Sequence, residues 1–203
     1  VDEHMCTSDP DIYAVGDAVE VRQFVSGQKA LIALAGPANK QGRIAADAIC
    51  EKNSAFSGSQ GSSILKLFEL TAASTGLNEK SAQSAKLKFD STVSYSASHA
   101  SYYPGAHSMT IKTLFLPETG KIIGAQIIGF DGVDKRIDVF AAAIRAGMTA
   151  SDLQELDLAY APPFSSAKDP VNMTGYIIEN LRSGLVKQVH WKKKKKMGEN
   201  VSL

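Results

Sequence analysis

One carboxylate in the sequence stands where a ligand could be held. Asp17 follows Gly16 and the short apolar run Ile12 to Val15, a pattern that predicts a buried strand ending in a tight turn. The glycine lets the backbone approach a ligand closely. The carboxylate can accept hydrogen bonds from sugar-like hydroxyls, whereas it would repel a nucleotide phosphate. These residues predict a polyol or ribose ligand at a strand end, with an ordinary strand followed by an Asp-containing turn as the alternative.

The second feature that could bind a ligand is a helix that we expect to begin at Pro37. Proline is tolerated at a first helical position, and Gly36 frees the approach to it. The free N–H groups and the positive dipole end of such a helix suit an anionic or electron-rich ring edge. An ordinary capped helix on the surface is the alternative interpretation.

The rest of the chain must supply the elements that position these groups, and its patterns predict an α+β architecture. Serines and glycines from Ser54 to Ser63 indicate a linker. Beyond it we expect a largely buried strand over Ile64 to Leu70 and a short helix capped by Asn78. A hairpin follows, with strands at 109–116 and 121–128 around a Pro-Glu-Thr-Gly turn.

Two further helices, with a shorter helical stretch at 151–156 between them, complete this second unit. Between 131 and 145, apolar residues recur at helical spacing and form one stripe toward a core, while Lys135, Arg136 and Asp138 face elsewhere. The stripe consists of Val133, Ile137, Phe140 and Ile144. Pro170 opens a final helix that we expect to stop at Gly184.

Charge and cysteine usage exclude several classes of function. The net charge of +1 creates no field that would steer the chain to nucleic acid or an acidic membrane, and no apolar run approaches the roughly 20 residues that span a bilayer. The basic run Lys192 to Lys196 is interpreted as a solvated linker. Cys6 and Cys50 form no CxxC pair, and the four histidines lack metal-ligand spacing. We therefore predict a cytoplasmic protein without a metal.

The segment from Thr7 to Asp17 resembles the second FAD fingerprint of the pyridine nucleotide–disulfide oxidoreductases. The pattern T-x-x-x-x-I-Y-A-x-G-D matches at every fixed position. The resemblance implies that Asp17 binds the ribityl chain of FAD, and that the helix end at Pro37 and Ala38 points at the pyrimidine side of the flavin ring. The cofactor-binding residues implied in this way are Thr7, Ile12, Tyr13, Gly16, Asp17, Ala18, Pro37, Ala38 and Tyr160.

Later motifs resemble the branch of this family that contains CoA-disulfide reductases, persulfide reductases and NADH oxidases. These motifs are HASYYPG, LAYAPPFS and KDPVNMTG. The resemblance implies that Tyr102 and Tyr160 reach from one subunit into the active site of the other, where they contact the substrate sulfur or the flavin edge. Lys168 would meet a phosphate of CoA, and Asn39 would touch the substrate arm. Plain interface packing is the alternative for the tyrosines, and a solvated surface position is the alternative for Lys168.

The resemblance also implies a division of the chain. Residues 1–56 would be the C-terminal segment of an FAD-binding α/β domain, 57–63 a linker, 64–184 a dimerisation domain, and 185–203 a linker with the start of a rhodanese domain. Neither a GxGxxG strand–helix unit nor the family's reactive cysteine is present. We therefore expect a C-terminal fragment that is inactive by itself.

The expected function is that of an FAD-dependent NAD(P)H oxidoreductase that reduces CoA disulfide or CoA persulfide as a homodimer. This chain would supply flavin contacts, the dimer interface and the two tyrosines, but not the nucleophilic cysteine. Half of an NADH oxidase or peroxidase is one alternative. A stand-alone dimerisation module without catalysis is another.

Overall fold

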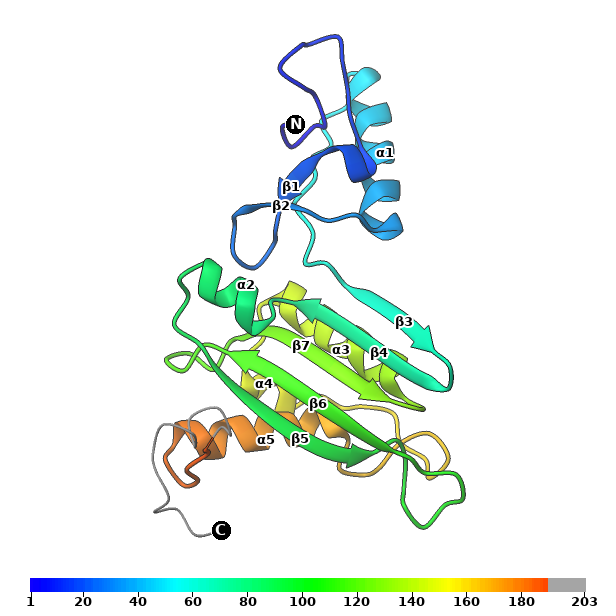
Figure 1. Ribbon diagram of the computed structural model, residues 1–203, viewed down its shortest axis with the longest axis vertical. Helices are drawn as coiled ribbons and strands as arrows, with labels where there is room; N and C mark the ends of the chain where they lie inside the picture. The colour runs from blue at the N-terminus through cyan, green and yellow to red at the C-terminus, as the bar shows by residue number, and fades with distance from the viewer. Residues whose placement is uncertain (190–203) are drawn as a thin grey trace.

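A five-stranded antiparallel sheet organises most of the described chain, which comprises residues 1–189 of the computed structural model (Figure 1). The strand order is β3-β4-β7-β6-β5. The strands are β3 (Ser63–Leu67), β4 (Leu70–Gly76), β5 (Asp90–Ala97), β6 (Ser108–Phe115) and β7 (Ile122–Gly129).

Helices cover one face of this sheet. They are α3 (Val133–Ala146), α4 (Ala150–Gln154) and α5 (Pro170–Arg182), while the short α2 (Glu79–Ser84) follows β4. Ile111 and Ile127 pair across β6 and β7, point to the helices and are fully buried with Phe140 of α3. Because side chains alternate between the faces of a strand, these residues define the core side of the sheet.

On the other face of the sheet, the short α2 covers only one end, where Lys112 of β6 forms an ion pair with Glu79 of α2 at 2.8 Å. One row of paired residues crosses it from edge to edge and consists of Leu65, Ala72, Ile128, Thr110 and Tyr95. Leu65, Tyr95, Ile128 and the neighbouring Val93 are between 40% and 75% exposed. These four residues define what we call the open face, and a hollow of about 390 Å³ lies on it.

The N-terminal residues form a smaller body above the sheet in Figure 1. It contains a 3-10 helix η1 (Gly16–Ala18), the two-stranded ribbon of β1 (Glu20–Arg22) and β2 (Lys29–Leu31), and α1 (Ala35–Ile49). The segment between the two bodies is anchored on both sides. Ser59 bridges Gln23, and the Gln60 side chain donates to the Ala141 carbonyl of α3 at 2.8 Å.

Several predicted elements are confirmed. Asn78 caps α2 through a reciprocal pair of hydrogen bonds with Ser81, and β6 and β7 form the predicted hairpin. The helices α3 and α5 lie close to their predicted bounds, with the apolar stripe of α3 buried. The prediction that Arg136 faces away from the core is wrong, because this residue is only 1% exposed.

The predicted strand over Ile64 to Leu70 is also wrong. The chain turns back at Phe68, which has a φ of 53° and is 92% exposed, so the run is divided between β3 and β4. All five residues of β3 are exposed. Leu67 and Leu70 pair across the turn. Because apolar residues continue through the turn, the sequence pattern does not indicate that the chain reverses there.

Two expectations near the N-terminus need correction. The run Ile12 to Val15 forms only the isolated bridge Cys6–Tyr13 within residues 1–189, and Ile12 is 54% exposed. The first long helix begins at Ala35, two residues before Pro37, with Leu34 as its N-cap. Pro37 still lies in the first turn, where a missing N–H costs no helical hydrogen bond.

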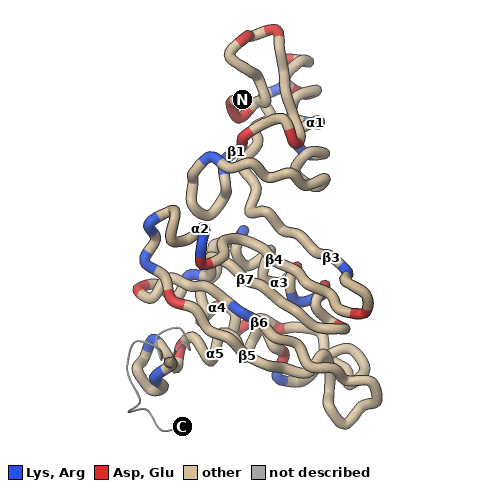
Figure 2. The backbone as a smooth tube through the Cα atoms, viewed as in Figure 1, with Lys and Arg blue, Asp and Glu red and all other residues tan. Residues whose placement is uncertain are grey.

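Charges of both signs are spread over both bodies of the molecule (Figure 2). Among the described residues, no helix has the length and apolar character needed to cross a membrane. The predicted lysine-rich linker and the predicted start of a rhodanese domain fall, from His190 onward, outside the described residues.

Candidate functional site

The turn that carries Asp17 is held against α1. Gly16 adopts a left-handed φ of 75°, which glycine tolerates without strain. Its N–H donates to Oε1 of Gln41 at 2.7 Å, and Gln41 is only 1% exposed. A Cβ placed on Gly16 would lie 3.8 Å from that of Ala38. The structure thus brings Gly16, Asp17 and Ala38 together, although they are separate in the sequence.

The groups available at this place fit a polyol joined to an electron-rich ring. Asp17 is exposed, and its carboxylate accepts no hydrogen bond from the described residues. About one turn from Ala38, the N-terminus of α1 has no side-chain cap, and Ala35 and Gly36 are exposed. A carboxylate acceptor therefore stands near free backbone donors at a helix N-terminus.

The residues that precede Asp17 shape its loop. The Thr7 hydroxyl donates to the Asp9 carbonyl at 3.0 Å and accepts from the Asp9 N–H at 3.1 Å. Tyr13 is half-buried and pairs with Cys6. Contact of Thr7, Ile12, Tyr13 or Ala18 with a cofactor stays a prediction.

The two candidate tyrosines meet directly. The hydroxyl oxygens of Tyr102 and Tyr160 are 3.0 Å apart, although the residues are 58 positions apart in sequence. Tyr102 is 75% exposed and Tyr160 is 46% exposed. The hydrogen bond to Tyr102 raises the pKa of Tyr160, with a smaller contribution from burial. A phenol with a raised pKa keeps its proton and remains a hydrogen-bond donor at neutral pH.

The tyrosine pair and the Asp17 turn do not form one site within the chain. Tyr102 lies on the loop that joins β5 and β6, at the lower end of the sheet in Figure 1, whereas α1 lies at the top of the molecule.

The remaining candidates, Lys168 and Asn39, are exposed. Lys168 contributes to a hollow of about 520 Å³ with Asn172 and Tyr176. The Asn39 amide donates to the Ala35 carbonyl of its own helix at 2.9 Å. Their roles toward a substrate stay predictions.

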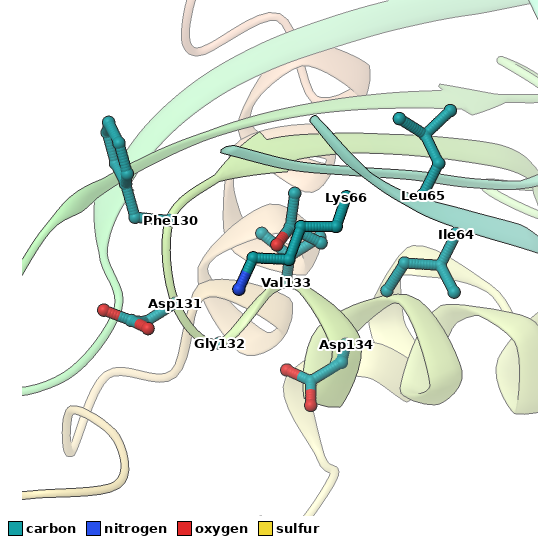
Figure 3. A pocket seen from close by; sticks show the side chains of 9 residues that line it. Ile64, Leu65, Lys66, Phe130, Asp131, Gly132, Val133 and Asp134 are labelled. Atoms are coloured by element: carbon teal, nitrogen blue, oxygen red, sulfur yellow. The ribbon is translucent and has the colours of Figure 1, made fainter. Parts of the chain in front are cut away.

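Another hollow contains none of the predicted site residues. It measures about 370 Å³ and lies where β3 passes the N-terminal end of α3 (Figure 3). Ile64, Leu65 and Phe130 supply apolar walls, while Lys66 and Asp134 supply opposite charges. No group of three or more histidine, cysteine or acidic side chains within residues 1–189 could hold a metal ion.

Sequence reasoning missed two sets of supporting residues. Gln41 lies inside the recognised helix segment, but nothing in its type indicated that it would accept from Gly16. Arg136, Ser165 and Asp169 form a buried cluster close to the tyrosine loops. A signal for Arg136 existed: it follows Val133 by three residues and precedes Phe140 by four, which places it on the apolar stripe of α3.

Comparison with known proteins gives a consistent result. Residues 62–171 match the sequence model of the pyridine nucleotide-disulphide oxidoreductase dimerisation domain. An NADH oxidase of Methanocaldococcus jannaschii is 36% identical over 85% of the chain, and a coenzyme A disulfide reductase of Staphylococcus epidermidis is 34% identical over 87%. The chain spans 38% and 40% of the lengths of these two relatives.

A solved structure agrees with these sequence matches. The crystal structure of reduced Bacillus anthracis CoADR-RHD superimposes with a TM-score of 0.94 and 49% sequence identity. The match covers 98% of this chain and 36% of that one. The similarity therefore includes the N-terminal body as well as the sheet.

Proposed function

The chain belongs to the pyridine nucleotide-disulphide oxidoreductase family, and from this premise we propose that it is the C-terminal part of an FAD-dependent, NAD(P)H-oxidising enzyme that reduces CoA disulfide or CoA persulfide. The part of such an enzyme represented here would hold one side of the flavin, form the dimer interface and supply two tyrosines. The reactive cysteine would come from another part of the enzyme.

The Asp17 turn supports the flavin assignment. Its exposed carboxylate would accept hydrogen bonds from the ribityl hydroxyls, and the uncapped N-terminus of α1, near Pro37 and Ala38, would face the electron-rich edge of the ring. Gln41 would hold the Asp17 turn in a fixed position relative to the N-terminus of α1, because it accepts a hydrogen bond from Gly16. FAD, when bound, would relay the electron pair from NAD(P)H toward the disulfide.

The observation that carries the proposal is the 3.0 Å contact between the hydroxyls of Tyr102 and Tyr160. Reduction of CoA disulfide by NAD(P)H and a proton yields two CoA thiols and NAD(P)⁺, and reduction of CoA persulfide yields CoA thiol and hydrogen sulfide. In both reactions a sulfur leaves with negative charge before it is protonated. A tyrosine O–H can donate a hydrogen bond to this sulfur and keep its own proton at neutral pH. The hydrogen bond between the two hydroxyls raises the pKa of Tyr160 further.

The distance between the tyrosine loop and α1 supports a shared active site in a homodimer. These segments lie at opposite ends of the molecule (Figure 1), so a subunit would present its tyrosines to the Asp17 turn of a second copy rather than to its own. The exposed apolar residues of the open face supply a surface for the second copy. Each subunit would then deliver Tyr102 and Tyr160 to the flavin site of its partner.

The other candidate residues have supporting roles in this proposal. Lys168, on the rim of its hollow, would bind a phosphate of CoA as a flexible point charge. Asn39, one turn into α1, would contact the substrate arm. We place the enzyme in the cytoplasm, where Cys6 and Cys50, both free, would remain reduced.

The test uses the complete enzyme with Tyr102→Phe and Tyr160→Phe combined. We expect turnover of CoA disulfide to fall roughly a hundredfold, because two donors to the leaving sulfur are removed, while the flavin absorption spectrum stays unchanged. Tyr103→Phe is the matched control, since it removes a neighbouring hydroxyl that faces no predicted partner. Undiminished turnover in the double variant would remove the role given to this pair.

A second candidate function is favoured by the similarity to an NADH oxidase. The complete enzyme would then pass its electrons to dioxygen or peroxide. Parallel assays with CoA disulfide and with dioxygen decide between the two acceptors. Faster NADH consumption with dioxygen alone, unaffected by the tyrosine substitutions, would favour the oxidase.

A further inference from the structure

Three buried side chains connect α3 with the segment before α5. Arg136, Ser165 and Asp169 are 1%, 1% and 3% exposed. Nη2 of Arg136 donates to Ser165 Oγ at 2.9 Å and to Asp169 Oδ2 at 3.1 Å. The Ser165 hydroxyl donates to the same Asp169 oxygen at 2.6 Å. Removal of one partner from a buried pair of this kind would leave an uncompensated buried charge, which is strongly destabilising.

The same cluster is tied to both tyrosine loops through the main chain of Ser165. The Ser165 carbonyl accepts from the Ala100 N–H at 2.8 Å, two residues before Tyr102. The Ser165 N–H donates to the Ala161 carbonyl at 3.1 Å, and Ala161 directly follows Tyr160. Ser165 therefore joins the two loops that carry Tyr102 and Tyr160.

Helix α3 adds two further connections to this arrangement. Nη1 of Arg136 donates to the Gly132 carbonyl at 3.3 Å, and the ammonium of Lys135 donates to the Ala159 carbonyl at 3.2 Å. A Cβ on Gly132 would lie 2.4 Å from Nη1 of Arg136. The absence of a side chain at Gly132 thus gives the guanidinium room to reach Ser165.

Asp169 completes the connection to α5. Its second carboxylate oxygen, Oδ1, accepts from the Val171 N–H at 2.9 Å, so the residue caps the helix while it pairs with Arg136. The loop segment from Tyr160 to Asp169 is consequently held from both α3 and α5.

We propose that Arg136, Ser165 and Asp169 are positioning residues that hold the Tyr102 and Tyr160 hydroxyls together. A hydrogen bond between two exposed side chains on separate loops competes with water and cannot fix those loops by itself. The buried cluster supplies the missing constraint, because it holds both loops from the inside. The catalytic consequence rests on the function proposed above for the tyrosines, whereas the positioning itself does not.

The decisive variant is Ser165→Ala in the complete enzyme, labelled with 3-fluorotyrosine and followed by fluorine NMR. Tyr160→Phe assigns the Tyr160 resonance. We expect the pKa of the labelled Tyr160 to fall toward the value of free 3-fluorotyrosine, because the hydrogen bond with Tyr102 that raises it is loosened. Turnover of CoA disulfide should fall roughly tenfold to a hundredfold, with the flavin spectrum unchanged.

Ser166→Ala is the matched control, since it removes the neighbouring hydroxyl and leaves the cluster intact; both readouts should remain at their wild-type values.

Arg136→Lys is the second variant. It keeps the charge, but a single ammonium cannot reproduce the guanidinium geometry, so it should shift the Tyr160 titration in the same direction. If this variant fails to fold, the Ser165→Ala titration alone decides.

A folded Ser165→Ala enzyme with an unchanged Tyr160 titration would overturn the positioning role. A shifted titration with unchanged turnover would instead support the positioning role and count against the catalytic function of the tyrosines. The two proposals therefore fail in distinguishable ways.

Discussion

The buried amide oxygen of Gln41 accepts a hydrogen bond of 2.7 Å from the Gly16 N–H, and this contact couples the Asp17 turn to α1. The left-handed backbone at Gly16 directs its N–H toward the helix. As a result, a loop with little regular structure has a fixed position relative to the helix N-terminus.

Substitution of Gln41 tests this coupling. Gln41→Leu leaves the Gly16 N–H without its acceptor, so we expect the free energy of unfolding of the complete enzyme to fall by about 1–3 kcal/mol. Urea unfolding monitored by circular dichroism measures the change. Gln83→Leu, on the exposed side of α2, is the control and should change stability by less than about 0.5 kcal/mol. Equal stabilities of the two variants would show that the contact contributes nothing.

Substitution of Asp17 tests the flavin contact. Asp17→Asn replaces a charged acceptor with a neutral amide, and we expect the affinity for FAD to fall roughly tenfold to a hundredfold in the complete enzyme, which corresponds to about 1.5–3 kcal/mol for a charged hydrogen bond. Flavin fluorescence titration of the apoenzyme gives the dissociation constant. Asp11→Asn, an exposed carboxylate in the same loop, should leave it unchanged. An Asp17→Asn enzyme that retains full affinity would refute the assignment.

The raised pKa of Tyr160 predicts a pH dependence. The protonated phenol is the active donor, so turnover should decline as pH rises through the pKa of Tyr160. In Tyr102→Phe the hydrogen bond that raises this pKa is lost, and the alkaline decline should begin at lower pH. A pH profile of kcat measures the alkaline decline in the complete wild-type enzyme and in the Tyr102→Phe variant. If the Tyr102→Phe variant has the same pH profile as the wild type, the alkaline decline does not arise from the tyrosine pair.

The open face predicts the effect of a charge on assembly. Ile128 lies in the row that crosses the sheet and is 53% exposed in the single chain. In the proposed dimer, Ile128→Glu would bury an unpaired carboxylate and weaken association by about 2 kcal/mol or more, roughly thirtyfold in Kd. Sedimentation velocity over a dilution series measures the dissociation. Lys66→Glu, on the opposite side of β3, is the matched control and should leave the dimer intact; dissociation by both variants would point to general destabilisation.

The parts of the fold that follow local rules could be predicted from the sequence. The β6–β7 hairpin is marked by its turn residues, α2 by the Asn78 cap, and α3 by the repeat of Val133, Ile137 and Phe140. Each of these signals acts over a few neighbouring residues. The reversal at Phe68 gave no such signal, because a phenylalanine with positive φ is uncommon and the surrounding apolar pattern continues.

In the candidate site, too, some features could be predicted from the sequence and others could not. The resemblance assigns Tyr102 and Tyr160 to the same active site, and their hydroxyls lie within hydrogen-bond distance of each other in the structure. The supporting contacts were not predictable, because the acceptors of Gly16 and Arg136 are distant in sequence and depend on tertiary packing. Residue type indicates what a side chain can donate or accept, but not which partner it will meet.

The separation of α1 from the β5–β6 loop has a consequence for mixed assemblies. If each centre takes its flavin contact from one subunit and its tyrosines from the other, a chain with Asp17→Asn and a chain with both tyrosines replaced by phenylalanine are each defective alone. Combined in one hybrid dimer, the two defects fall on the same centre and leave the other centre intact. Co-expression of the two damaged chains should therefore restore up to half of the wild-type rate per hybrid, a complementation that an enzyme with self-contained subunits cannot display.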